Sequence, residues 1–187
     1  VYSEFAHPSI VHNKPFFFAL GTINPKKNFH ILPAMLLKND YELIIAGGSA
    51  ESDYEALIVE TARKLGVRER VKIIGAITDS EKYWLYKNCE AFCLPSQAEG
   101  FGAPVLEAMQ FGTPVILAEA TSLPELGGPH AFYFNEFSTD AVSQTAEGFL
   151  NRPITEIIRT ELINWAGKFD WEVAAKKYWS LYQEVLS

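Results

Sequence analysis

The chain has 187 residues, of which 48% are hydrophobic and 21% charged, and its formal net charge is −7. This length suits one well-cored domain and is short for two, and the composition is that of an ordinary globular protein. The negative charge argues against nucleic acid or an anionic membrane as the main partner, although one or two local cations would suffice to bind a phosphate. No apolar run reaches the roughly 18 residues that a membrane-spanning helix needs.

The first fifteen residues have neither the basic-then-apolar pattern of a signal peptide nor an initiator methionine, and they indicate an extended lead-in. We therefore expect a fragment or a processed chain. Cys89 and Cys93 are too few for a structural zinc site. They favour a reduced, cytoplasmic setting in which both are buried small apolar groups.

Short, continuous apolar runs alternate with amphipathic segments along the first 150 residues. Unalternated runs of this kind are typical of strands buried on both faces of a parallel sheet. The expected strands are 15–21, 42–48, 71–77, 91–96, 113–120 and 131–134, and the expected helices are 28–38, 51–65, 79–88, 103–111 and 138–150. This order predicts an α/β fold, a doubly wound, mostly parallel, Rossmann-like sheet with helices on both faces. Such sheets bind ligands at the carboxyl ends of their strands.

The pattern changes after residue 150, where two helices are expected at 153–167 and 171–186. The second has aromatic residues at helical spacing along one face, which predicts packing against the rest of the domain. We find no internal repeat or linker. The sequence therefore predicts a single domain over 1–187, with a lead-in at 1–15, a Rossmann-like core at 16–150 and terminal helices at 151–187 that close it.

The stretch "PSQAEGFGAPVLEAM", residues 95–109, places two glutamates eight positions apart around a glycine-phenylalanine-glycine turn. Gly100 and Gly102 remove the side chains that would block a ligand from the backbone. Ala103-Pro104 suits the first turn of a helix, whose free N–H groups favour an anion. An ordinary glycine turn before a helix is the alternative interpretation.

The two glutamates would meet different parts of a ligand. Glu107 lies about one turn inside the expected helix, and its side chain leans back toward the helix start. Its carboxylate could accept from two neighbouring hydroxyls, such as a ribose diol, although a solvated surface acid is the alternative. Glu99 precedes the turn.

Three further loops lie on the same predicted edge of the sheet. Lys26 and Lys27 close the loop after the first strand, where a lysine would neutralise phosphate charge, with solvated loop lysines as the alternative. Gly47 and Gly48 end the second strand and would let a ligand approach. Asp79, after the third strand, is expected to cap a helix.

Several chemistries have no motif in this sequence. There is no D-x-D triplet, no G-x-x-x-x-G-K-[ST] loop and no G-x-S-x-G elbow. Ser96 has no evident histidine partner, and the four histidines show no metal-ligand spacing. We therefore expect neither a metal nor a cofactor.

The segment "EGFGAPVLEAMQFGTPVI" resembles the E-x7-E signature of the group 1 glycosyltransferases, which are retaining enzymes of the GT-B architecture. The likeness extends in the family's order through "FALGTINPKKN", "ELIIAGG", "VKIIGAITDSEKYWLYKNCEAFCLPS", "ATSLPELGG" and "FDWEVAAKKYWSLYQEVL". It covers nearly the whole chain but only the carboxyl-terminal half of a typical member, the domain that binds the donor nucleotide sugar. The resemblance implies metal-independent transfer of a hexosyl group, with retention, to an acceptor held by a missing N-terminal domain.

The resemblance also implies roles for individual residues. Glu107 would hold the ribose hydroxyls. Glu99, as a catalytic residue, and the amides of Phe101, Gly102 and Ala103 would face the transferred sugar and the diphosphate. The other members of the implied site are Lys27 as the catalytic phosphate lysine and, for donor binding, Gly21, Thr22, Lys26, Gly48, Ile77 and Gly100.

Thr22 departs from the family pattern, because many members have arginine at that position. The second cationic phosphate contact is therefore in doubt, and Lys26 is a candidate substitute. Backbone atoms near Ile77 would take the base, while Gly21 and Gly48 would leave room for the ligand.

Two alternatives remain open: a non-catalytic nucleotide-sugar binding module, and a GT-B sugar-nucleotide epimerase. A dinucleotide-dependent oxidoreductase is disfavoured because the glycine turn follows the fourth strand instead of the first. "GTINPKKN" resembles motifs of mannosyltransferase-like members, which favours GDP-mannose as donor. We expect a cytoplasmic protein with no transmembrane segment, whose full-length form could still associate peripherally with a membrane. The fragment alone is expected to be inactive in transfer.

Overall fold

A single parallel sheet forms the centre of the computed structural model, which describes residues 5–8, 14–49 and 52–186. Most of the expected lead-in therefore lies outside the described residues. Within them the strands are β1 (Phe16–Leu20), β2 (Glu42–Ala46), β3 (Val71–Ile73), β4 (Ala91–Leu94), β5 (Val115–Ala118) and β6 (Phe132–Phe134). They lie in the order β3-β2-β1-β4-β5-β6, and every neighbouring pair is parallel. The predicted doubly wound sheet is confirmed.

The topological switch point lies between β1 and β4. Phe18 of β1 pairs with Ile44 of β2 on one side and with Phe92 of β4 on the other. The chain winds outward from this centre in both directions, so the connections that follow β1 and β4 cross opposite faces of the sheet. Any ligand site of this fold is expected where these two connections start, at the carboxyl ends of β1 and β4.

The helices alternate with the strands as the sequence predicts. They are α1 (Ser52–Lys64), α2 (Asp79–Asn88), α3 (Ala103–Gln110), α4 (Leu123–Gly127), α5 (Thr139–Leu150), α6 (Glu156–Ala166) and α7 (Trp171–Leu186), with 3₁₀ helices η1 (Pro25–Lys27), η2 (Phe29–Leu36), η3 (Arg68–Arg70) and η4 (Gly128–His130). The segment 28–38, expected as a helix, is a 3₁₀ helix over Phe29–Leu36. Asn28 is left-handed, with φ of 58°, and Pro33 has no N–H to donate inside the turn. The five-residue α4 is too short to show a helical period, and the sequence did not predict it.

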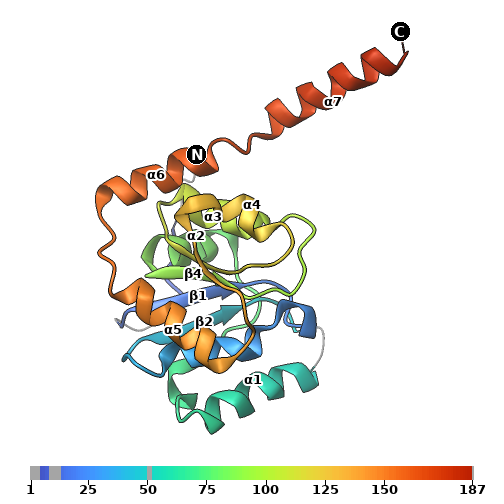
Figure 1. Cartoon of the computed structure of the whole chain (residues 1–187). Coiled ribbons are helices and arrows are strands. Elements are labelled where there is room, and N and C mark those ends of the chain that lie inside the picture. Colours follow the sequence, from blue (N-terminus) through green and yellow to red (C-terminus); the bar gives the residue numbers. More distant parts are fainter. Residues whose placement is uncertain (1–4, 9–13, 50–51, 187) are drawn as a thin grey trace.

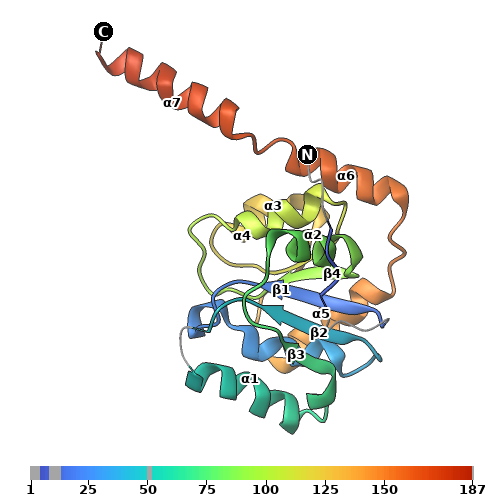
Figure 2. The same ribbon diagram turned by 180° about the vertical axis from the view of Figure 1, so that it is seen from behind.

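Helices cover both faces of the sheet (Figures 1 and 2). η2 packs against α1 and α5 on one face, while α2, α3 and α4 lie on the other, with α6 against α3. Phe18, Phe92 and Tyr86 of α2 meet edge to face at ring distances of 5.3 to 5.8 Å and are fully buried. Each such side chain contributes roughly 1.5–3 kcal/mol through burial. This aromatic cluster fixes α2 over the two central strands.

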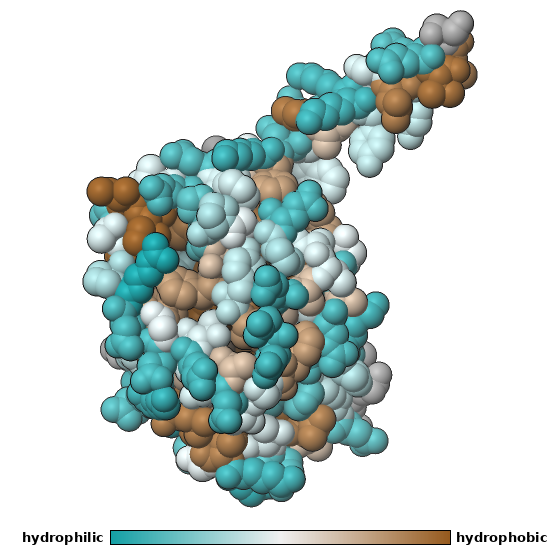
Figure 3. All heavy atoms as spheres, in the orientation of Figure 1, coloured by the Kyte–Doolittle hydropathy of each residue, from teal (hydrophilic) through white to brown (hydrophobic). Residues whose placement is uncertain are grey.

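The two C-terminal helices differ in how they pack. In α6, Leu162 and Ala166 are buried and the Trp165 Nε1–H donates to the Leu126 carbonyl at 2.6 Å. α7 has no buried residue and projects away from the body in both ribbon views, and the apolar side chains along it are visible in Figure 3. Its Trp171 is 78% exposed. The Trp171 ring lies 6.0 Å from that of Phe101, centroid to centroid, but the expected packing of the rest of the aromatic face is not found within the described residues. Among those residues, no helix has both the length and the hydropathy that crossing a bilayer requires.

Candidate functional site

Lys27 lies at the end of a short capped turn after β1. The Asn24 Oδ1 accepts the backbone N–H of Lys27 at 3.2 Å, and Pro25 occupies the first position of η1. With the backbone fixed in this way, the Lys27 ammonium reaches the Glu99 carboxylate, with Nζ 2.6 Å from Oε1. The two side chains are 20% and 12% exposed. The structure thus brings Lys27 and Glu99 together across the switch point.

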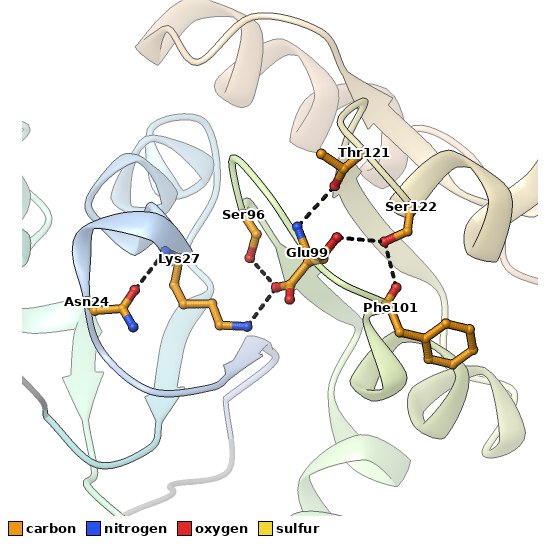
Figure 4. Close-up of polar contacts among 7 residues, drawn as sticks. All are labelled: Asn24, Lys27, Ser96, Glu99, Phe101, Thr121 and Ser122. Carbon is orange, nitrogen blue, oxygen red and sulfur yellow. Dashed lines mark hydrogen bonds and ion pairs between the residues drawn. The ribbon is translucent and has the colours of Figure 1, made fainter.

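Glu99 follows β4 and is held at several atoms (Figure 4). Its Oε1 also accepts from the buried Ser96 hydroxyl at 2.6 Å, and its N–H donates to the Thr121 Oγ1 at 3.0 Å. Ser96 therefore orients this carboxylate. The same Glu99 oxygen takes both charge-assisted hydrogen bonds, which are the strong class of such bonds.

The glycine turn precedes α3 at the switch point. Gly102 has φ of +101°, a conformation that favours glycine, and a Cβ there would lie only 3.1 Å from the side chains of Leu123 and Leu126 of α4. A Cβ on Gly100 would meet nothing within 4 Å. Among the hydrogen bonds of the described residues, the N–H groups of residues 100–103 have no acceptor. They lie at the N-terminus of α3 and in the turn directly before it, where a helix favours an anion.

Glu107 faces α2 from the second turn of α3. Its Oε2 accepts from the Tyr86 hydroxyl at 3.1 Å and lies 3.4 Å from the Lys82 Nζ, which is also 3.1 Å from Asp79 Oδ1. The Glu107 side chain is 34% exposed. Glu107 is therefore a partly buried acid in a network with Tyr86 and Lys82.

The pKa of Lys82 reflects this network. Burial disfavours its charged form, but hydrogen bonds and charge interactions with Asp79 and Glu107 outweigh burial and raise the pKa above its usual value. Lys82 and Tyr86 were not singled out in the sequence. Their contacts with Glu107 join α2 to α3. Such contacts depend on how the two helices pack, so no motif or spacing in the sequence indicates them.

The start of α2 corrects one expectation. Thr78, not Asp79, is the N-cap: its Oγ1 accepts the Glu81 N–H at 3.3 Å, while the Glu81 carboxylate accepts the Thr78 N–H at 2.8 Å. The Thr78 N–H and the Thr78 hydroxyl both donate to the Glu81 carboxylate at 2.8 Å, and these two hydrogen bonds lower the pKa of Glu81. The sequence signal was present as a T-x-x-E capping box. Ile77, the expected base contact, is partly buried directly before this cap.

The glycines of the neighbouring loops have different tasks. Gly47 has φ of +140°, and a Cβ there would lie 2.0 Å from the Gly21 carbonyl oxygen, so Gly47 serves loop-to-loop packing and not ligand approach. Gly48 is exposed, with nothing within 4 Å of a Cβ. At Gly21 a Cβ would lie 3.3 Å from the Lys27 Cε, so this glycine gives the lysine side chain its path.

The remaining predicted site residues after β1 make fewer side-chain contacts than Lys27 does. Thr22 and Lys26 are exposed, and the Lys26 carbonyl accepts the Gln97 N–H at 3.1 Å, which ties the β1 loop to the β4 loop.

Cys89 and Cys93 are buried and free, and burial raises the pKa of each thiol. Within the described part of the chain, no group of three or more acidic, histidine or cysteine side chains is arranged to hold a metal.

The fold and the site together define a Rossmann-like α/β domain with a lysine-carboxylate pair and a glycine-opened helix at its switch point. The family model described as "Glycosyl transferases group 1" matches residues 3–165. The chain belongs to this family.

Among its relatives, the O-antigen chain mannosyltransferase B of Escherichia coli is 32% identical over 162 residues, which are 82% of this chain and 42% of that protein. The serotype-specific mannosyltransferase WbdA of Escherichia coli is 30% identical over 165 residues, 83% of this chain and 20% of that protein. This chain thus spans less than half the length of these relatives.

Solved structures show the same fold. A glycosyltransferase from Rickettsia africae superposes with a TM-score of 0.81 at 18% identity, over 95% of this chain and 49% of that one. Anabaena HepE, in complex with UDP and glucose, gives a TM-score of 0.81 at 24% identity, over 92% of this chain and 49% of that one. The fold is that of the C-terminal domains of GT-B glycosyltransferases.

Proposed function

We propose that this chain is the donor-binding part of a glycosyltransferase, which binds a nucleoside-diphosphate sugar and transfers its hexosyl group with retention and without a metal. The observation that carries the proposal is the Lys27–Glu99 pair, 2.6 Å apart beside the free amides of the glycine turn. A cation, a carboxylate and unpaired N–H groups at one switch point suit a ligand that carries both phosphate and sugar hydroxyls.

Each residue has a part in the proposed reaction. The bond from the anomeric carbon to the diphosphate breaks, the acceptor oxygen bonds to that carbon on the same face, and the acceptor's proton passes to the leaving phosphate. Lys27 and the N-terminus of α3 stabilise the negative charge that grows on the leaving oxygen. Glu99 faces the sugar ring. The Glu107 carboxylate accepts hydrogen bonds from the ribose hydroxyls, and the backbone near Ile77 binds the base. The positive charge is supplied by the protein itself, so the proposed reaction uses no metal.

The proposed donor is GDP-mannose. The relatives named above are mannosyltransferases, whereas the HepE structure contains UDP and glucose, so base and sugar both need a direct test. A thermal-shift screen of the intact protein against UDP, GDP, ADP and their sugars is such a test. A ligand at a concentration of 100 Kd stabilises the folded protein by about 2.7 kcal/mol, which gives a readable shift.

The proposed acceptor site lies on an N-terminal domain that precedes these residues. We propose a cytoplasmic location for the full-length protein, which could also associate peripherally with a membrane. The described residues contain one sheet only, and this chain covers 42% of its mannosyltransferase relative. Holding donor and acceptor together is worth roughly 7–11 kcal/mol in catalysis. The 187-residue chain alone should therefore bind the donor and transfer almost nothing. Robust transfer by these residues alone would place the acceptor site within them.

The decisive experiment incubates the intact protein with donor alone and then with donor and acceptor. A transferase converts donor efficiently only when acceptor is present, and Glu99→Ala abolishes that conversion. Donor binding without turnover under both conditions would instead favour a non-catalytic binding module. Conversion of the sugar nucleotide without any acceptor would favour an epimerase.

A further inference from the structure

The loop between β5 and α4 holds the glycine turn through two adjacent hydroxyls. The Ser122 Oγ–H donates to the Phe101 carbonyl at 2.7 Å and lies 3.4 Å from the Glu99 carbonyl oxygen. The Thr121 Oγ1 accepts the Glu99 N–H at 3.0 Å. Both residues reach across from a different strand connection, as Figure 4 shows. We call this pair the Thr121–Ser122 clasp.

Ser122 does not do what a serine at its position normally does. It occupies the N-cap position of α4, where a serine side chain usually accepts a backbone N–H of the first turn. Here it makes no such bond, and its hydroxyl is directed to the glycine turn instead. Ser138, the N-cap of α5, shows the ordinary behaviour: its Oγ accepts the Ala141 N–H at 3.2 Å.

Thr121 also departs from its usual conformation. Its φ is +48°, in the left-handed region that a β-branched residue rarely adopts. This conformation accompanies the hydrogen bond from Glu99. Strained backbone of this kind persists where the surroundings hold it, and it clusters at ligand sites.

The clasp sets the direction of the N–H groups in the turn. A trans peptide is planar, so its N–H points opposite to its carbonyl. The Ser122 hydroxyl faces the carbonyls of Glu99 and Phe101, and the N–H groups of Gly100 and Gly102 therefore point away from Ser122. Glycine tolerates either orientation of the peptide before it, so the turn itself cannot enforce this arrangement. The restraint has to come from outside the turn.

We propose that Thr121 and Ser122 are positioning residues that hold the glycine turn with its N–H groups directed at the diphosphate of the donor. This inference rests on the proposed function, because the diphosphate is the ligand that those amides would bind. The clasp acts through the turn, and neither hydroxyl touches the donor itself.

The test is calorimetry on the intact protein with GDP and UDP, each compared with its nucleoside. Ser122→Ala should weaken binding of the diphosphate by about tenfold, the equivalent of about 1.4 kcal/mol. Nucleoside affinity should change less than about twofold, because ribose and base are bound elsewhere. Ser122→Thr, which restores the hydroxyl, should recover most of the loss. Ser138→Ala is the matched control, and it should leave both affinities unchanged.

A second variant covers the case in which Ser122→Ala does not fold. Thr121→Val keeps the branched shape and removes the acceptor for the Glu99 N–H, so it should also weaken the diphosphate selectively, with recovery in Thr121→Ser. Wild-type diphosphate affinity in both variants, or an equal loss for nucleoside and diphosphate, overturns the clasp proposal alone. If the unmodified protein binds no nucleoside diphosphate, the proposed function falls and the clasp proposal falls with it.

Discussion

The two glutamates of the E-x7-E segment lie in different electrostatic surroundings. Glu99 is 12% exposed, and one of its oxygens takes both the Lys27 ammonium and the Ser96 hydroxyl. Glu107 is 34% exposed, and its Oε2 takes the Tyr86 hydroxyl and lies near Lys82. Within the described residues, the other oxygen of Glu107 has no hydrogen-bond donor. Glu99 is therefore paired with Lys27, which takes part in the proposed reaction. Glu107 is instead held by Tyr86 and Lys82, which do not take part in it.

This difference indicates how each half of the site would receive a ligand. For the phosphate side to bind a diphosphate, Lys27 has to share or exchange its carboxylate partner. If Glu107 binds the ribose as proposed, no such exchange is needed there, because its Oε2 is already held by Tyr86 and its other oxygen is available. A preorganised acceptor of this kind loses less free energy on binding. The three predictions below test this contrast, from the largest expected effect to the smallest.

Lys27→Ala should produce the largest loss. Removing the cation leaves the growing phosphate charge with the α3 amides alone, so kcat of the intact protein should fall by about 10²–10³-fold. Calorimetry should also show a larger loss for the diphosphate than for the nucleoside. Equal losses for the two ligands would mean that Lys27 supports the loop and not the phosphate.

Lys26→Ala is the matched control for that variant, since Lys26 is the exposed neighbour on the same turn. Its effect on diphosphate affinity should be smaller than that of Lys27→Ala. An effect as large as that of Lys27→Ala would show that Lys26 replaces the cation missing at Thr22.

Glu107→Ala should weaken nucleotide binding by about tenfold to about 150-fold. The reason is the loss of the charge-assisted hydrogen bonds from the ribose hydroxyls to this carboxylate, worth about 1.5–3 kcal/mol in total. The fold should survive, because the side chain is partly exposed. A 2′,3′-dideoxynucleotide is the internal control: its affinity should be nearly the same for both proteins. Wild-type affinity of this variant for the ribonucleotide would refute the ribose assignment.

Lys82→Met should have the smallest effect, a loss of about threefold in nucleotide affinity, which is the scale of a partly exposed ion pair.

Because the pKa of Lys82 is raised in the folded state, its charge stabilises the fold fully below the unfolded pKa of about 10.4, and this contribution is lost as pH rises through the folded pKa. The difference in unfolding free energy between the two proteins should therefore be constant from about pH 6 to about pH 9 and shrink above about pH 10.4. Chemical denaturation across this range measures it, and a difference that instead grows above pH 10 would contradict the ion-pair account.

Much of the fold was predictable because buried parallel strands leave continuous apolar runs that need no knowledge of their neighbours. The same holds for the glycine turn and for the start of α3, where Pro104 and the glycines act locally. The helix expected at 28–38 is present, but its 3₁₀ type was not predicted, because the left-handed Asn28 and the missing N–H of Pro33 leave the apolar pattern unchanged. The cap of α2 was misassigned to Asp79 although the Thr78–Glu81 box is local and could have been recognised.

The sequence by itself determined the alternation of strands and helices, the family, and the group of residues that the strand ends carry to one edge of the sheet. Only the tertiary structure decided which of those residues meet. Lys27 and Glu99 are 72 positions apart, and they touch because β1 and β4 are neighbours at the switch point. Thr121 and Ser122 bond the glycine turn from 21 to 23 positions away, and Lys82 meets Glu107 across two helices. Such contacts leave no period or spacing in the chain, because they depend on how separate elements pack and not on the local geometry of any one of them.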